Sequence, residues 1–186
     1  MADPALRRAT YEDLFALPAH VVGEILDGEL VVSPRPGLAH GAAASALGEE
    51  LGPPFKRGRG GPGGWVILDE PELHLRDDVV VPDLAGWRRE RMPEIPETAA
   101  CSLAPDWVAE VASPKTAAID RTVKLDIYAR EQVSHVWIVD AGAKLLEVFV
   151  LDGPGYRRVA AWAGDAKVRA VPFDAIELDL ALLWSR

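Results

Sequence analysis

Apolar and polar positions along the chain follow two different periods, and the changes of period divide the chain into strands and helices. Short apolar runs, either alternating with polar residues or uninterrupted, are typical of strands. They predict strands at residues 65–68, 73–75, 79–81, 107–112, 135–140, 145–151 and 156–162. Apolar positions at helical spacing predict helices at residues 11–17, 38–51 and 116–132.

Turn residues connect these segments. In "VVGEILDGELVVS" two apolar runs flank Asp27-Gly28, a dipeptide that favours a two-residue hairpin turn because both positions need a positive φ. The glycine-rich stretch 52–64 is predicted to be a flexible basic loop, and the proline-rich stretch 88–105 a long loop. The last apolar segment, residues 176–184, is predicted to pack as a cap.

The order of these elements indicates the fold class. A strand, a helix and a second strand follow one another between residues 108 and 139, which implies a right-handed crossover and parallel pairing of the two strands. We therefore predict an α/β protein with a mixed sheet. No linker or internal repeat divides the chain, so residues 1–186 are expected to form one domain.

Composition indicates the class of protein and the compartment to expect. The chain has 186 residues, of which 49% are hydrophobic and 26% charged, as in ordinary globular proteins. No apolar run approaches the ~20 residues that span a bilayer, and no export signal is recognisable, so no membrane partner is expected. Cys101 is the single cysteine and excludes an internal disulfide. We expect a cytoplasmic protein.

Charge is distributed unevenly along the chain. The formal net charge of −9 argues against binding nucleic acid over the whole surface. Two loops are nevertheless basic, one with Lys56, Arg57 and Arg59 and the other beginning at Arg88. Each cluster could be no more than a solvated loop, and the sequence leaves a local nucleic-acid-binding surface open.

Two carboxylates lie at positions where an acidic side chain could take part in catalysis. Asp83 follows Pro82, which cannot donate to a sheet ladder, so the strand must end, bulge or lie at an edge there. Glu110 lies in the apolar strand "WVAEVAS", where an acid is unfavourable unless it is paired or bound to a cation. Taken alone, Asp83 is better explained by a plain turn, and a salt bridge to Lys124 would explain Glu110.

The helix after Glu110 carries three polar residues on one face, since Asp120, Lys124 and Tyr128 are four positions apart. A solvated ion pair is the simple explanation of this spacing. Combined with Asp83 and Glu110, however, the set offers hard oxygen ligands for Mg²⁺ or Mn²⁺ and a lysine to assist the attacking water. That combination suits the hydrolysis of a phosphodiester bond.

These residues occur in an order that resembles the Uma2 family of the PD-(D/E)xK, restriction-endonuclease-like nucleases. The resemblance rests on Pro82-Asp83, on "EVAS" from Glu110, on Asp120, Lys124 and Tyr128, on "HVWIVD", and on the upstream "GEILDGELVVSPRPGLAH". It implies a restriction-endonuclease-like core of a helix, three strands, a helix and a strand, with an extra N-terminal hairpin and C-terminal strands.

The same resemblance implies roles for individual residues. Asp83 and Glu110 would bind the metal and Lys124 would be the catalytic lysine. The family name places a lysine two residues after the acid, where this chain has Ala112, so the helix supplies it instead; Lys115 is a less favoured substitute. The supporting residues are Asp120 and Tyr128, with His40, Glu29 and Glu24 as weaker candidates.

The sequence thus predicts an Mg²⁺- or Mn²⁺-dependent endonuclease acting on DNA. The alternatives are a catalytically silent module of the same fold that binds nucleic acid or protein, and a phosphodiesterase acting on RNA or small nucleotides. A homodimer is also expected, from the resemblance and from the apolar side chains Trp137, Phe149 and Trp162 in the C-terminal strands.

Overall fold

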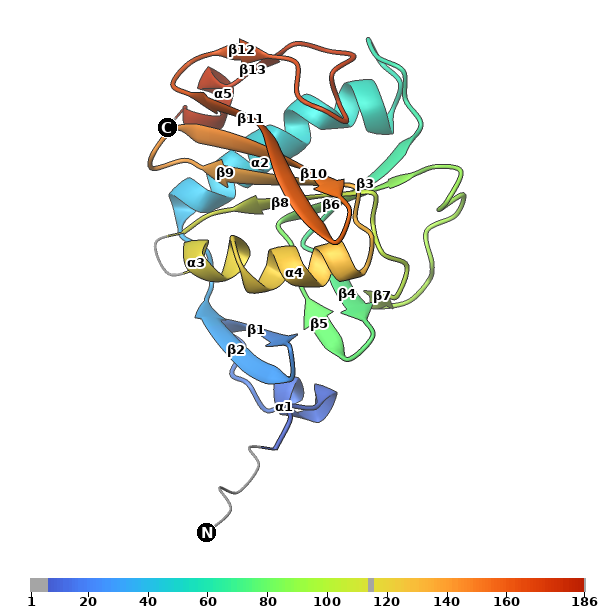
Figure 1. Cartoon of the computed structure of the whole chain (residues 1–186), viewed down its shortest axis with the longest axis vertical. Coiled ribbons are helices and arrows are strands. Elements are labelled where there is room, and N and C mark those ends of the chain that lie inside the picture. The colour runs from blue at the N-terminus through green and yellow to red at the C-terminus, as the bar shows by residue number, and fades with distance from the viewer. Residues whose placement is uncertain (1–6, 114–115, 186) are drawn as a thin grey trace.

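A six-stranded sheet runs through the middle of the protein, in the order β11-β10-β9-β8-β6-β3 (Figure 1). The structure is a computed structural model that describes residues 7–113 and 116–185. The strands of this sheet are β3 (Trp65–Asp69), β6 (Leu84–Arg88), β8 (Trp107–Val111), β9 (His135–Asp140), β10 (Leu145–Asp152) and β11 (Gly155–Ala163). Strands β8 and β9 pair in parallel and the other neighbours are antiparallel, so the predicted mixed sheet and its parallel unit are confirmed.

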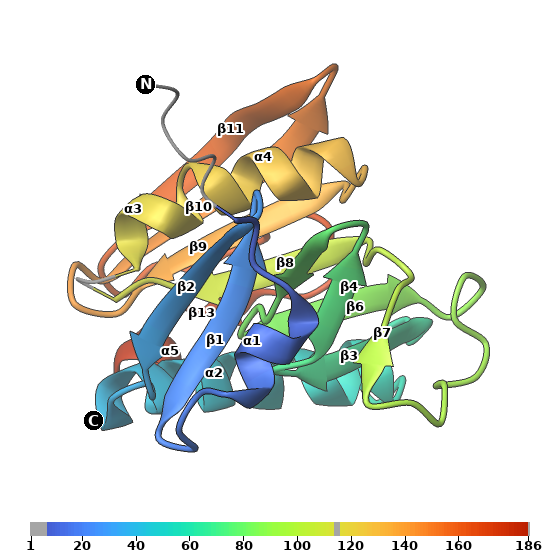
Figure 2. The same cartoon turned by 90° about the horizontal axis from the view of Figure 1, so that it is seen from below.

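Helices cover both faces of this sheet (Figures 1 and 2). One face carries α2 (Leu38–Leu51), the short π-helix η1 (Gly52–Lys56) and α5 (Ala181–Trp184). The other carries α3 (Ala117–Asp120) and α4 (Val123–Arg130). The alternation along β8 sorts its side chains between the two cores, Trp107 to the α2 side and Val108 to the α4 side. Among the described residues no helix is both long and apolar enough to cross a membrane.

A second sheet, in the order β2-β1-β5-β4-β7, packs beside the first (Figure 2). It consists of β1 (Val21–Leu26), β2 (Glu29–Pro34), β4 (Glu72–Leu75), β5 (Asp78–Val80) and β7 (Ala100–Cys101), preceded by α1 (Tyr11–Phe15). The predicted hairpin is confirmed, because β1 and β2 pair around Asp27 and Gly28, whose φ angles are 51° and 84°. Leu26 reaches the core on the α4 side, so the second sheet closes that core.

The C-terminal segment completes the core on the α2 side. It contains β12 (Lys167–Val168), β13 (Leu178–Asp179) and α5. Phe173 lies in a ring of aromatic side chains, with centroid distances of 4.6 to 5.6 Å to Phe55, Trp65, Trp107 and Trp137. Leu178, Leu180, Leu183 and Trp184 belong to the same core, so the segment 176–184 packs as the predicted cap. Trp137 is 0% exposed and takes no part in the open apolar face expected for a dimer, which stays a prediction.

Three local expectations were wrong. All predicted strands were expected in one sheet, but β4 and β5 belong to the second sheet. The strand between β3 and β8 in the six-stranded sheet is β6, which was not predicted. The helix expected over residues 116–132 is divided at Arg121-Thr122, where the Thr122 hydroxyl donates to the carbonyl of Ala118, a contact that bends helices. The loop after α2 begins with η1 instead of irregular chain.

Candidate active site

Asp83 lies where the chain crosses from one sheet to the other. Strand β5 ends at Val80 in the second sheet, and β6 begins at Leu84 in the six-stranded sheet. Pro82, between them, has no N–H to give to a ladder. The amide of Val81 donates instead to Oε1 of Glu24, at 2.8 Å. The prediction that the strand must stop here is confirmed, and the carboxylate of Asp83 is left at the junction of the sheets.

Glu110 is buried in the middle of β8, with 3% of its surface exposed. The Tyr128 hydroxyl on α4 donates to its Oε1 at 2.5 Å. Nζ of Lys124, one turn earlier on α4, lies 3.3 Å from each carboxylate oxygen. Helix α4 packs on the face of β8 towards which Glu110 points, so the strand and the helix together satisfy a buried acid that would otherwise be strongly unfavourable.

Lys124 is the cation at the centre of an acidic cluster and is 4% exposed. Its Nζ lies 3.0 Å from Glu24, 3.3 Å from Glu110 and 3.7 Å from Asp120. Burial alone would lower the pKa of Lys124, but the carboxylates of Glu110, Glu24 and Asp120 raise the pKa above its usual value. The lysine is therefore charged at any physiological pH.

Asp83 is held by a backbone amide and a histidine. Its Oδ2 accepts from the amide of Val111 at 2.7 Å, and its Oδ1 lies 3.1 Å from Nε2 of His40. The same Nε2 lies 2.9 Å from the carbonyl oxygen of Val111, so it faces two acceptors and carries the proton. Burial lowers the pKa of His40, which keeps the ring neutral.

The cluster holds more acidic groups than basic groups. Four carboxyl groups, those of Glu24, Asp83, Glu110 and Asp120, surround Lys124 or lie beside it. Burial raises the pKa of Asp83 to about 7, and burial likewise raises the pKa of Glu110 and of Asp120. A second positive charge would relieve this excess.

A divalent metal ion fits the cluster in donor type and in charge. Carboxylate oxygens are the ligands that Mg²⁺ and Mn²⁺ prefer. Because the acidic groups outnumber the basic groups, a bound cation would balance their charge. In the described part of the chain, however, no group of three or more His, Cys, Asp or Glu side chains is arranged to hold a metal. Glu110 is engaged by Lys124 and Tyr128, so its side chain would have to exchange partners to bind an ion.

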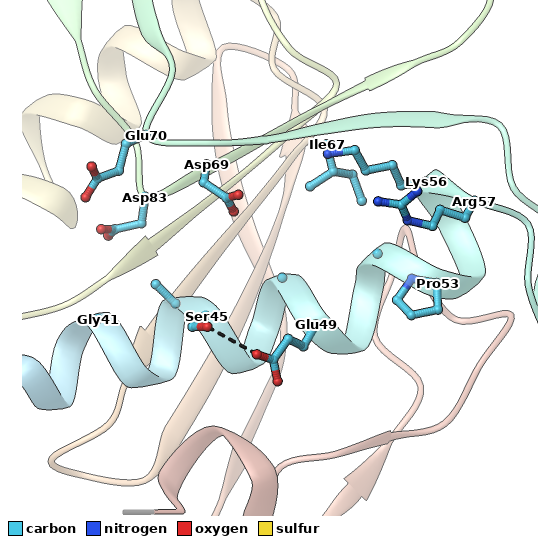
Figure 3. A pocket seen from close by; sticks show the side chains of 13 residues that line it. Gly41, Ser45, Glu49, Pro53, Lys56, Arg57, Ile67, Asp69, Glu70 and Asp83 are labelled. Carbon is cyan, nitrogen blue, oxygen red and sulfur yellow. Dashed lines mark hydrogen bonds between the residues drawn. The ribbon is translucent and has the colours of Figure 1, made fainter.

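Two hollows open onto the cluster. A small pocket of about 100 Å³ is lined by Asp83, Glu110, Lys124 and Glu70. A larger groove of about 730 Å³ lies beside it between α2 and β3 and shares Asp83 and Glu70 with the pocket (Figure 3). The candidate site is thus reached from a groove that is larger than the pocket itself.

Most of the residues singled out in the sequence meet here. Asp83, Glu110 and Lys124 surround one pocket, as do Asp120 and His40. Tyr128 lies behind them as the hydrogen-bond donor to Glu110.

Other candidates lie elsewhere. Glu29 is exposed at the start of β2, beyond the hairpin turn, and does not join the cluster. Lys56 and Arg57 line the far end of the large groove, whereas Arg59 is exposed in the following loop. The guanidinium of Arg88 lies 4.1 Å above the Trp65 ring. Lys115 is outside the described residues.

Two acids of the site were missed or given little weight. Glu24 contacts Lys124 more closely than Glu110 does, and its signal in the sequence was an acid within the apolar stretch before the hairpin turn. Glu70 follows β3 with a φ of 44°, and its amide donates to the carbonyl of Asp83 at 2.9 Å. Nothing in its acidic, proline-containing turn "DEPE" distinguishes it from a solvated loop.

Known proteins resemble this chain at two levels. Over almost its whole length, residues 10–181, it matches the model of a family described as "Uma2: Putative restriction endonuclease". No curated protein sequence matches it. Its fold is similar to the crystal structure of a protein from Anabaena variabilis ATCC 29413, described as "a putative nuclease belonging to DUF820".

That structural match has a TM-score of 0.76 at 21% sequence identity, and covers 95% of this chain and 97% of the other. At this identity the likeness establishes the fold alone. The extent of the family match carries the further conclusion, and it confirms the resemblance found in the sequence. The chain belongs to the Uma2 family of restriction-endonuclease-like nucleases.

Proposed function

We propose that this protein is a metal-dependent endonuclease that hydrolyses DNA phosphodiester bonds. The observation that carries the proposal is the meeting of Asp83, Glu110 and Lys124 at one pocket in a chain of a nuclease family. Asp83 and Glu110 would hold Mg²⁺ or Mn²⁺. When bound, the ion would lower the pKa of a water molecule and neutralise charge on the phosphate.

The residues of the chain have separate tasks in this proposal. Lys124, charged and next to Glu110, orients the attacking water and stabilises the negative charge that develops on the phosphate. His40 and the amide of Val111 fix the two oxygens of Asp83. The hydroxyl of Tyr128 fixes one oxygen of Glu110. Glu24 and Asp120 keep Lys124 protonated.

The test is a cleavage assay on duplex DNA, single-stranded DNA and RNA, each with Mg²⁺, Mn²⁺ or EDTA. Asp83→Asn and Lys124→Met are compared with Asp152→Asn, which changes an exposed carboxylate on β10. We expect metal-dependent cleavage by the wild type and by Asp152→Asn, and its loss in the other two variants. Equal cleavage by all four proteins would refute the assignment of the site.

A catalytically silent module of the same fold is the second candidate. The observation in its favour is that the amine of Lys124 already contacts three carboxylates, and that Glu110 already contacts Lys124 and Tyr128. Calorimetric titration with Mn²⁺ separates the two candidates. Heat of binding that Asp83→Asn abolishes supports the enzyme, whereas absence of both binding and cleavage supports the silent module.

A further inference from the structure

The groove between α2 and β3 has two chemically different ends. Asp83 and Glu70 lie at one end, at the candidate site, while Lys56 and Arg57 lie at the other (Figure 3). We propose that this groove binds a single polynucleotide strand and that Lys56 and Arg57 hold one of its backbone phosphates. The direction of the strand towards Asp83 rests on the proposed function; the binding itself does not.

The helix side of the groove has room for such a strand because its side chains are small. Five residues of α2 and η1 line it at helical spacing: Gly41, Ala44, Ser45, Gly48 and Gly52. A Cβ atom built at Gly41 or at Gly52 meets no atom within 4 Å, whereas one built at Gly48 would lie 3.3 Å from Oδ1 of Asp69. The groove is therefore open above Gly41 and Gly52 and narrower above Gly48. The groove volume of about 730 Å³ lies in the range of sites that enclose ligands.

The two basic side chains at the other end of the groove are available to bind an anion. Lys56 and Arg57 are exposed, and in the part of the chain that the structure describes neither forms an ion pair. The amide of Arg57 donates to the carbonyl of Gly52 at 3.1 Å, which anchors the backbone at the end of η1. In a chain of net charge −9, an ordered pair of free cations is well suited to bind a phosphate.

The acids along the groove restrict where phosphates can lie. Glu49 and Asp69 line its middle (Figure 3) and repel phosphates, so along this part the strand turns its bases towards the groove and its phosphates towards solvent. From Ser45 to Lys56 the helix advances eleven residues, or about 16 Å. That length corresponds to roughly five nucleotides at the ~3.4 Å rise of one stacked strand.

The same features disfavour an intact duplex. Duplex DNA carries one charge per ~1.7 Å of length, twice the density of one strand, while the groove offers two cations against several carboxylates. Glu110, at the bottom of the adjoining pocket, is almost completely buried. A flexible single strand can bend a phosphate towards such a pocket, whereas the phosphates of a duplex are held on the outside of a rigid helix.

The experiment measures the binding of 12-nucleotide single-stranded DNA, single-stranded RNA and duplex DNA by fluorescence anisotropy, in EDTA and over a salt series. Lys56→Ala combined with Arg57→Ala is compared with Arg157→Ala, an exposed arginine on β11 at the opposite edge of the sheet. We expect single strands to bind more tightly than duplex. The double variant should bind about tenfold more weakly and lower the salt slope by about 0.7, since it loses one phosphate contact and each such contact on a single strand contributes about 0.7.

A second pair of variants tests the groove without changing charge. Gly41→Leu places a side chain in the open space and should weaken binding of single strands, while Gly41→Ala should not, because alanine is small and favours the helix. An unchanged salt slope in the double variant, an equal loss in Arg157→Ala, or tighter binding of duplex would each overturn the inference.

The outcome is separable from that of the proposed function. Binding through Lys56 and Arg57 without any cleavage in Mn²⁺ would support the groove and refute the hydrolysis. Cleavage of single strands by the wild type that the double variant retains in full, with unchanged binding, would refute the groove and support the hydrolysis.

Discussion

Removing the central lysine is the sharpest test of how the acidic cluster is stabilised. Lys124→Met replaces a buried ammonium that lies within 3.7 Å of Glu24, Glu110 and Asp120 by an apolar chain of similar length. Breaking a buried ion pair in this way costs about 3–5 kcal/mol, because the partner charge is left uncompensated. We expect a loss of this size in the free energy of unfolding at pH 8, measured without metal.

The loss should shrink at pH 5. In the variant the buried carboxyl groups hold protons to a higher pH than they do in the unfolded chain, because burial already raises the pKa of Glu110 and Asp120 and Lys124 no longer opposes it. The native state then binds more protons than the unfolded state, so the stability of the variant falls as the pH rises.

The assay is urea unfolding followed by tryptophan fluorescence at both pH values, in EDTA. Lys167→Met, an exposed lysine on β12, serves as the control and should change stability by less than about 0.5 kcal/mol. Adding Glu110→Gln to Lys124→Met should recover part of the loss at pH 8. An equal loss at pH 5 and pH 8 would show that the lysine stabilises by packing and not by charge, and would refute the reasoning.

Three further predictions concern neighbouring groups. Burial raises the pKa of Asp83 from 3.8 to about 7, so the metal-free protein should lose stability as the pH rises from about 4 to 7, and Asp83→Asn should flatten that slope in a denaturation series. Tyr128→Phe removes the donor to Glu110 and should cost about 1.5–3 kcal/mol in urea unfolding. Arg130→Met leaves Asp78, 2% exposed, without its cation. Because Arg130 is itself 36% exposed, we expect about 2–3 kcal/mol, seen as a lower Tm; no fall in Tm would contradict the pairing.

The elements that the sequence predicted well are those in which local and long-range forces agree. Asp27-Gly28 needs positive φ at both positions and forms the turn of β1 and β2. The stripe of small apolar residues predicted a helix over residues 38–51, and α2 has these bounds in the structure. The parallel pairing of β8 with β9 follows from the helix between them.

The elements that were missed depend on contacts distant in sequence. Strand β6 contains Gly86, which weakens any strand pattern. It is accommodated because the rings of Trp65 and Trp107 lie against that position, with atoms 3.0 to 3.3 Å from where a Cβ would be. The break before α4 depends on one threonine hydroxyl, whose choice of acceptor is not visible in a hydrophobic pattern.

The site residues also fall into those that the sequence could predict and those that it could not. Glu110 could be selected because an acid is unusual in an apolar strand, and Asp83 because Pro82 interrupts the strand before it. Lys124 was selected because it shares a helix face with Asp120 and Tyr128 and because of the resemblance to the family. Glu24 and Glu70 reach the pocket only through the packing of the second sheet and the turn after β3, which no local pattern specifies. Of the two acids considered in this hairpin, Glu24 lies beside Lys124, whereas Glu29 lies next to the turn, opposite Leu26.

The aromatic ring around Phe173 has a consequence for synthesis on the ribosome. Trp65, Trp107 and Trp137 are made well before the residue that covers them, and about 36 residues separate Trp137 from Phe173. At roughly 5–20 residues per second, that aromatic face stays open to solvent or to chaperones for about 2–7 s. Nascent chains stalled in this interval should be the species most prone to aggregation, and codon changes that slow this interval should lower the yield of folded protein.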